Sequence, residues 1–168
     1  MTGLLVRLFI KNRDDINDSA VRSSYGTLGG TVGIVCNLFL CALKLTVGFL
    51  TASISIVADG LNNLSDMGSS VITMIGFKMA GKPADSDHPF GHGRMEYMSA
   101  FIVAILILLV GGELFKSSVS ALVNGDAIPE YSAAALIILA VSILVKLWMC
   151  LFNRRLGKKI NSEALLAT

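Results

Sequence analysis

The chain alternates long apolar stretches with short polar segments. A hydropathy window of about 19 residues, the length that crosses a bilayer as a helix, gives four candidate spans. They cover residues 28–50, 53–80, 98–119 and 131–152. Asn161 or Ser162 then resembles a helix N-cap, and residues 163–167 predict the first turns of a fifth helix. The pattern therefore predicts an all-α membrane protein, a bundle of transmembrane helices with four full spans and the start of a fifth.

Composition agrees with a membrane class. Hydrophobic residues make up 54% of the chain and charged residues only 15%, whereas a soluble domain has about a quarter charged residues. The mean hydropathy is +0.70. The net charge of +2 is too small to indicate a nucleic-acid partner. Cys36, Cys41 and Cys150 fall inside apolar runs and form no CxxC pair, so we interpret them as packing residues.

Lys and Arg gather in alternate connecting segments. They precede the first span, lie between the second and third, and follow the fourth: Arg7, Lys11, Arg13 and Arg22; Lys78, Lys82 and Arg94; Arg154, Arg155, Lys158 and Lys159. The other two connections, at residues 51–52 and 124–130, contain neither. The positive-inside rule then predicts a multi-pass protein of the cell membrane with a cytoplasmic N-terminus.

The same pattern predicts two parts. Residues 1–27 form a cytoplasmic N-terminal segment, and residues 28–168 form a transmembrane domain. A membrane protein rarely ends one turn into an apolar helix. We therefore expect this domain to be incomplete and the chain to be a fragment.

The second span carries a polar stripe. Asp59, Asn62, Asn63 and Asp66 share one helix face at about 100° per residue. A carboxylate at mid-membrane costs at least about 2.5 kcal/mol, and this helix holds no cation before Lys78. A mobile countercharge, a metal ion or protons, would compensate it. Hydrogen bonding between helices is the alternative, and for Asn63 both interpretations stay open.

Asn62 and Asp66 are four residues apart, so their oxygens can converge on one ion if another helix completes the site. Oxygen ligands suit hard divalent cations, and a histidine here would favour zinc. Lys44 in the first span and Lys146 in the fourth are also charged. The sequence does not decide whether they snorkel or pair with carboxylates.

A second group of polar residues lies between the second and third spans. Asp85, His88 and His92 occur within eight residues of a Gly/Pro-containing loop, and these are the only histidines of the chain. Their ligand types match zinc-like sites. The alternative is a solvated loop whose histidines cap the next helix. Glu96 follows at the helix start, where a carboxylate is favoured and could support the site or face Arg94 or a neighbouring cation.

Two motifs resemble the cation diffusion facilitators. They are Ala-Asp-Gly-Leu-Asn-Asn-Leu-Ser-Asp at residues 58–66 and the loop from Pro83 through Phe-Gly-His-Gly to Glu96. The resemblance implies proton-coupled export of divalent cations, a homodimer, six spans and a cytoplasmic metal-binding domain. It also implies that Asn62 and Asp66 form half of a transport site. By this resemblance we expect the helix-five ligands and the cytoplasmic domain to lie outside these 168 residues.

Asn62 also resembles the bacterial manganese-exporting branch, so we expect Mn²⁺, with Zn²⁺, Fe²⁺ or Co²⁺ as alternatives. The cation is a substrate, and no fixed cofactor is expected apart from Zn²⁺ or a similar ion at the loop.

Two other function classes fit less well. An intramembrane metal-dependent hydrolase using His88 and His92 would need a Glu between helical histidines, but Pro89 and Gly91 intervene. A non-transporting membrane scaffold would have no use for Asp66. The sequence therefore favours a transporter over an enzyme.

Overall fold

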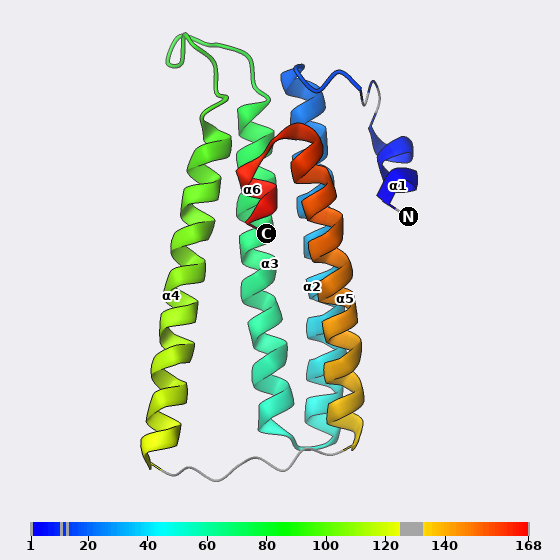
Figure 1. The fold of residues 1–168 in the computed structure, drawn as a ribbon, viewed down its shortest axis with the longest axis vertical. Coiled ribbons are helices and arrows are strands. Elements are labelled where there is room, and N and C mark those ends of the chain that lie inside the picture. The colour runs from blue at the N-terminus through cyan, green and yellow to red at the C-terminus, as the bar shows by residue number, and fades with distance from the viewer. Residues whose placement is uncertain (1, 11, 13, 125–132, 168) are drawn as a thin grey trace.

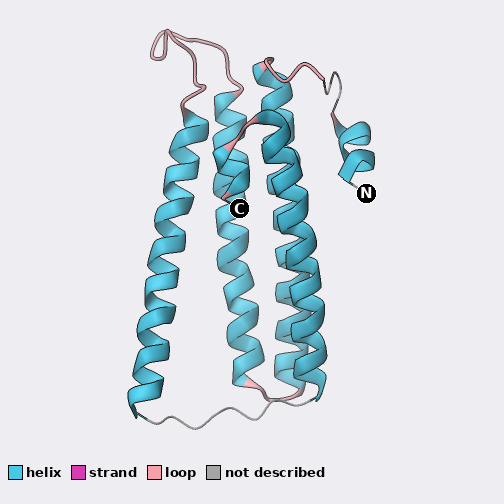
Figure 2. Cartoon of the chain, in the orientation of Figure 1, coloured by secondary structure: helices cyan, strands magenta, loops and turns pink. Residues whose placement is uncertain are grey.

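The computed structural model describes residues 2–10, 12, 14–124 and 133–167. Throughout these residues the regular structure is helical (Figures 1 and 2). The helices are α1 Thr2–Phe9, α2 Ser19–Leu50, α3 Ile54–Ala80, α4 Met95–Asn124, α5 Ala133–Ile160 and α6 Glu163–Leu166. The four long helices run side by side, α2 and α3 being joined by a tight turn (Figure 1).

Three of the described helices are long and apolar enough to cross a membrane, namely α2, α4 and the Ala135–Ile160 part of α5. The predicted all-α fold is thus confirmed, and these three helices are consistent with a membrane bundle. The polar-striped α3 is 27 residues long and packs against α2 and α4. Four full spans stay a prediction. Helix α2, which contains the first predicted span, begins at Ser19, nine residues before the predicted start at Leu28. The carboxylate of Asp18 accepts a hydrogen bond from the Ala20 amide and so caps this helix.

Small residues bring α2 close to α3. A Cβ atom added to Gly26 would lie 1.8 Å from the Phe77 ring, and one added to Gly33 would lie 2.4 Å from the Ser70 hydroxyl. Without side chains at these positions the two backbones can approach closely, as is common between membrane helices. This close packing fixes α3, and its polar stripe, against α2.

The hydrophobic core lies at one end of the bundle, where α1 and the first turns of α2 meet α5 and α6. Its members include Tyr25, Phe77, Phe152, Leu156 and Leu165. By contrast, α4 leaves large apolar side chains uncovered, among them Leu108, Phe115 and Leu122. Such a surface suits lipid rather than water.

The segments rich in Lys and Arg lie at one end of the molecule. The start of α2, the α3–α4 connection and the end of α5 are all at the top of Figure 1. A positive-inside topology requires this arrangement.

The start of a further helix was predicted after Asn161 or Ser162. The Ser162 hydroxyl accepts a hydrogen bond from the Leu165 amide, and α6 turns back to contact α4 and α5. This confirms a helix start with its N-cap at Ser162. Part of the predicted connection before the fourth span, with the start of that span at Tyr131, lies outside the described residues.

Candidate cation site

The two aspartates of the polar stripe each meet a lysine from another helix. The Lys44 ammonium on α2 lies 2.7 Å from a carboxylate oxygen of Asp59, and only 1% of the Lys44 side chain is exposed. The Lys146 ammonium on α5 lies 2.7 Å from a carboxylate oxygen of Asp66. Both lysines therefore pair with carboxylates, which answers the question that the sequence left open.

This pairing corrects one step of the sequence argument. From the sequence, a mobile ion was expected to supply the countercharge of the polar stripe, since α3 itself holds no cation before Lys78. In the structure, Lys44 and Lys146 supply it from helices α2 and α5. Helical periodicity describes one helix at a time, so it could not reveal partners on other helices.

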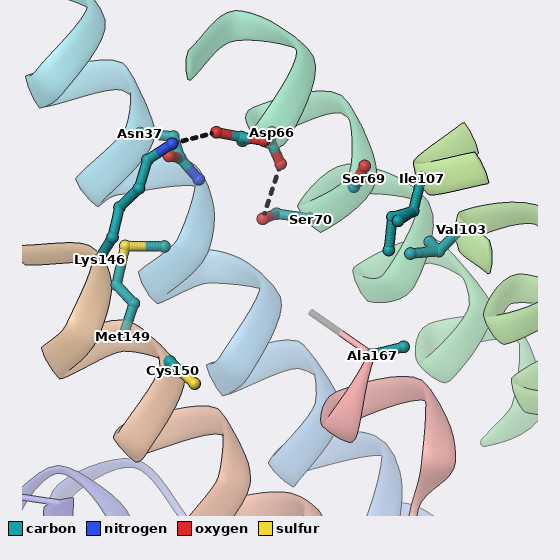
Figure 3. A pocket seen from close by; sticks show the side chains of 10 residues that line it. All are labelled: Asn37, Asp66, Ser69, Ser70, Val103, Ile107, Lys146, Met149, Cys150 and Ala167. Carbon is teal, nitrogen blue, oxygen red and sulfur yellow. Dashed lines mark hydrogen bonds and ion pairs between the residues drawn. The ribbon is translucent and has the colours of Figure 1, made fainter. Parts of the chain in front are cut away.

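Asp66 lines a cavity of about 190 Å³ between α2, α3, α4 and α5. Figure 3 shows Lys146 reaching from α5 toward Asp66, with Asn37 of α2 beside both. Ser69 and Ser70 continue the same wall on α3, and the Ser70 hydroxyl donates to the Asp66 backbone carbonyl. The carboxylate thus borders a cavity inside the helix bundle that has both polar and apolar walls.

Asn62 faces a different space. It lines a cavity of about 520 Å³ between α3 and α4, together with Ser65 and Asp66. Asp66 therefore borders both cavities and Asn62 only the second. Asn62 and Asp66, predicted to bind one ion together, both line the α3–α4 cavity, as their spacing of four residues on α3 allows.

Asn63 and Asn37 are buried, and their side-chain oxygens accept no hydrogen bond. Asn63 is fully buried, and neither polar atom of its side chain has a hydrogen-bond partner. The Asn37 side-chain oxygen is likewise buried and unpartnered. Buried polar atoms are normally hydrogen-bonded, so unpaired ones call for an explanation. Sequence reasoning did not select Asn37 as a site residue, although a polar residue interrupting the first apolar span was the available signal.

The loop residues Asp85, His88 and His92 are brought together. Each offers one ligand atom within 4.8 Å of the others. His88 Nδ1 lies 3.5 Å from one Asp85 oxygen and His92 Nε2 lies 3.4 Å from the other. Two imidazoles and a carboxylate converging on one point can hold a zinc-like cation.

Hydrogen bonds position these ligands. The Asp85 carboxylate accepts the backbone N–H groups of Asp87 and His88, and the His88 bond in particular holds the pKa of Asp85 below its usual range. His92 Nδ1 lies 3.1 Å from the Pro83 carbonyl, so its Nε2 is the nitrogen directed at Asp85. His92 is buried whereas Asp85 and His88 are exposed, so the group is only partly a solvated loop.

Glu96 pairs with a cation other than Arg94. Both of its carboxylate oxygens lie 3.0 Å from one guanidinium nitrogen of Arg22 on α2. The other guanidinium nitrogen of Arg22 donates to the Ile160 carbonyl at the end of α5. Through Arg22, Glu96 is therefore part of a link between α2, α4 and α5, which favours the structural interpretation of this residue.

Comparison with known proteins identifies a family for most of the chain. Residues 30–168 match the family described as the cation efflux transmembrane domain. An uncharacterized transporter of Methanocaldococcus jannaschii is 36% identical over 81% of this chain and 48% of its own length. The Bacillus subtilis manganese efflux system proteins MneS and MneP are 35% and 32% identical, over 84% and 81% of this chain and 49% and 45% of their own lengths.

The chain thus spans about half the length of the curated relatives it matches. No solved structure matches it significantly. The matched family consists of transporters rather than enzymes and moves divalent cations across membranes. Because the match covers most of the sequence and includes both polar motifs, the chain belongs to the cation efflux family, the cation diffusion facilitators.

Proposed function

We propose that this chain forms part of a proton-coupled exporter of divalent cations, with Mn²⁺ as the preferred ion. One observation carries the proposal: Asp66 is a carboxylate on a helix in the middle of an apolar bundle, bordering two cavities. An intramembrane ionisable residue facing a cavity is the usual mark of an ion pathway.

Asn62 and Asp66 supply oxygen ligands from α3. Both line the α3–α4 cavity, so an ion there can contact an amide oxygen and a carboxylate oxygen together. Asp59 and Asn63 extend the stripe along the helix, with Asp59 held by Lys44. Two protein ligands do not complete the shell of a divalent cation, so further ligands come from outside α3.

Protons compete with the metal for the same carboxylate. A metal ligand must be deprotonated, so protonation of Asp66 releases the ion and deprotonation allows it to bind again. Protons entering from outside would release the ion there, and proton loss to the cytoplasm would reload the site. Export is then an exchange of metal for protons.

The choice of Mn²⁺ rests on ligand chemistry and on two relatives named as manganese efflux proteins. Asn62 and Asp66 offer no nitrogen or sulfur, which suits the harder ion. Zinc generally binds such sites more tightly than manganese does, so the preference also depends on coordination number and on metal availability. Zn²⁺, Fe²⁺ and Co²⁺ are the alternative cargoes.

The proposed topology has four full spans, α3 included, in the cell membrane, with the N-terminus and the α3–α4 loop cytoplasmic. The common position of the segments rich in Lys and Arg supports it (Figure 1). The working unit is a homodimer. Asp85, His88 and His92 bind Zn²⁺ or a similar cation at the cytoplasmic face, separately from the transport site, and order or regulate the loop.

The experiment is metal flux into proteoliposomes containing the full-length protein. Wild type should accumulate Mn²⁺, and Asp66→Ala should not. Asp14→Ala is the matched control, since Asp14 is an exposed carboxylate near the start of α2. If Asp66→Ala transported as fast as wild type, the transport site would lie elsewhere. Absence of any metal flux in wild type would favour a scaffold or a hydrolase.

A further inference from the structure

Lys146 and Asp66 form an ion pair in which both members line the same cavity. The ammonium nitrogen lies 2.7 Å from the carboxylate oxygen, and both groups line the cavity of about 190 Å³. In Figure 3 the Lys146 side chain reaches from α5 to α3, where its charged end meets Asp66. A positive charge thus already occupies the space beside the proposed metal ligand.

A divalent cation and this ammonium group compete for the Asp66 carboxylate, since Lys146 already contacts one of its two oxygens. A hard metal ion binds within about 2.6 Å of its oxygen ligand, close to the distance at which Lys146 now sits. Two positive charges that close repel strongly, and more so where helices exclude water. Lys146 therefore weakens binding of the ion at Asp66 unless it withdraws.

The two lysines of the site differ in their freedom to withdraw. Lys44 is buried, with 1% of its side chain exposed. Lys146 has 39% of its side chain exposed, and Asp66 41%. A lysine has a flexible stem of four carbons that can move the charge by several rotations. Asp59 and Asp66 are about equally exposed, at 40% and 41%, so the difference lies in the lysines: the buried Lys44 makes the Asp59 pair a fixed link between helices, and Lys146 makes the Asp66 pair an exchangeable one.

The cavity also contains an oxygen suited to a cation. The Asn37 side-chain oxygen is buried, has no hydrogen-bond partner and belongs to a residue that lines this cavity. A bound cation would satisfy it, whereas simple packing would leave it unpaired at a cost. This observation is independent of the ion pair and indicates a site for a positive ion.

We infer that Lys146 is a tethered competitor of the transported cation, holding Asp66 while the site is free of metal and setting how tightly the metal binds. The inference rests on the proposed function, because it concerns the same carboxylate. In this role Lys146 sets the affinity for the metal. It weakens metal binding, neutralises the Asp66 carboxylate between transport cycles, and lets the ion leave readily.

The test measures Mn²⁺ binding to the purified full-length protein at one fixed pH. Lys146→Met removes the competing charge and keeps the length of the side chain. Its affinity for Mn²⁺ should rise by about tenfold or more, the scale expected when repulsion between neighbouring charges is removed. Transport should slow, since release becomes harder. A residue with a merely structural role would lower affinity on removal or leave it unchanged.

Two further variants bracket this result. Lys146→Arg keeps the charge and should bind Mn²⁺ much as wild type does. Lys159→Met removes the same charge from α5 at an exposed pair with Asp14, and it should leave affinity unchanged. If Lys146→Met does not fold, Lys146→Gln is measured instead. An equal or lower affinity in whichever neutral variant is folded overturns the inference.

The outcomes separate this inference from the function on which it rests. If Asp66→Ala abolishes flux but the Lys146 variants bind as wild type does, the exporter proposal stands and the competitor role is wrong. If Asp66→Ala leaves flux intact, the transport site itself is wrong, and the competitor role is overturned with it.

Discussion

Arg22 and Glu96 join the helices at the end of the bundle where the basic residues gather. One guanidinium nitrogen of Arg22 lies 3.0 Å from both carboxylate oxygens of Glu96, which begins α4. A second guanidinium nitrogen donates to the carbonyl of Ile160, where α5 ends. The Glu96 side chain is 8% exposed, so the pair is largely shielded from water. One arginine therefore fixes the relative positions of α2, α4 and α5.

Breaking this pair should destabilise the bundle. Glu96→Gln leaves the Arg22 charge without its partner, and unpaired buried charges cost about 3–5 kcal/mol. Because Arg22 is partly exposed, we expect about 2–3 kcal/mol and a lower unfolding temperature in detergent. Asp14→Asn breaks the exposed pair with Lys159 and should cost less than about 1 kcal/mol. Equal losses in the two variants would show that Arg22 and Glu96 do not link the helices.

A methyl group at Gly26 should separate α2 from α3. Its Cβ would lie 1.8 Å from the buried Phe77 ring, so either the ring or the helix must move. Overpacking of this kind costs about 1–3 kcal/mol, and we expect Gly26→Ala to unfold at a lower temperature. Gly112→Ala is the control, since nothing lies within 4 Å of its added Cβ. Wild-type stability in Gly26→Ala would contradict the close packing of these helices.

The fold was predictable from the sequence where local pattern determines it. Apolar length predicts the long helices, and the polar pair Asn161 and Ser162 predicts a cap for α6, which the structure places at Ser162. The early start of α2 was missed because residues 19–27 are too polar for a hydropathy window, although Asp18 is an effective N-cap. A hydropathy window finds the apolar part of a helix that lipid can cover, whereas the helix itself begins and ends at its capping residues.

The candidate site was predictable only in part. Asp85, His88 and His92 are close in sequence, so their spacing alone predicted a cluster that the structure brings together. The partners of Asp59 and Asp66 come from α2 and α5, and Lys146 is 80 residues from Asp66. No periodicity within one helix encodes such a contact. Asn37 was missed for the same reason, because its burial depends on the neighbouring helices.

The loop cluster should bind metal without being the transport path. A His88→Ala/His92→Ala variant should lose one class of bound Zn²⁺, counted by equilibrium dialysis with elemental analysis, yet keep measurable Mn²⁺ flux. Asp87→Asn, in the same loop but outside the cluster, should keep all of its zinc. Complete loss of flux in a correctly folded double variant would instead make this loop part of the pathway.

A histidine at position 62 should change the choice of metal. Asn62→His places an imidazole nitrogen beside Asp66 on the α3–α4 cavity, and nitrogen ligands favour zinc over manganese. We expect the ratio of Zn²⁺ to Mn²⁺ flux to rise, measured by competition in the same vesicles. Asn62→Gln keeps an amide oxygen and should keep more of the wild-type preference. An unchanged ratio in Asn62→His would mean that residue 62 does not contact the transported ion.

The central claim is that Asp66 exchanges metal for protons, and one measurement tests it directly. Full-length protein is reconstituted into vesicles that enclose a pH-sensitive dye, and Mn²⁺ is added outside under a fixed membrane potential. For wild type the account predicts that Mn²⁺ enters while the interior becomes more alkaline as protons leave, and that Asp66→Asn abolishes both changes. Mn²⁺ entry with no pH change in wild type, or unaltered exchange in Asp66→Asn, would contradict it.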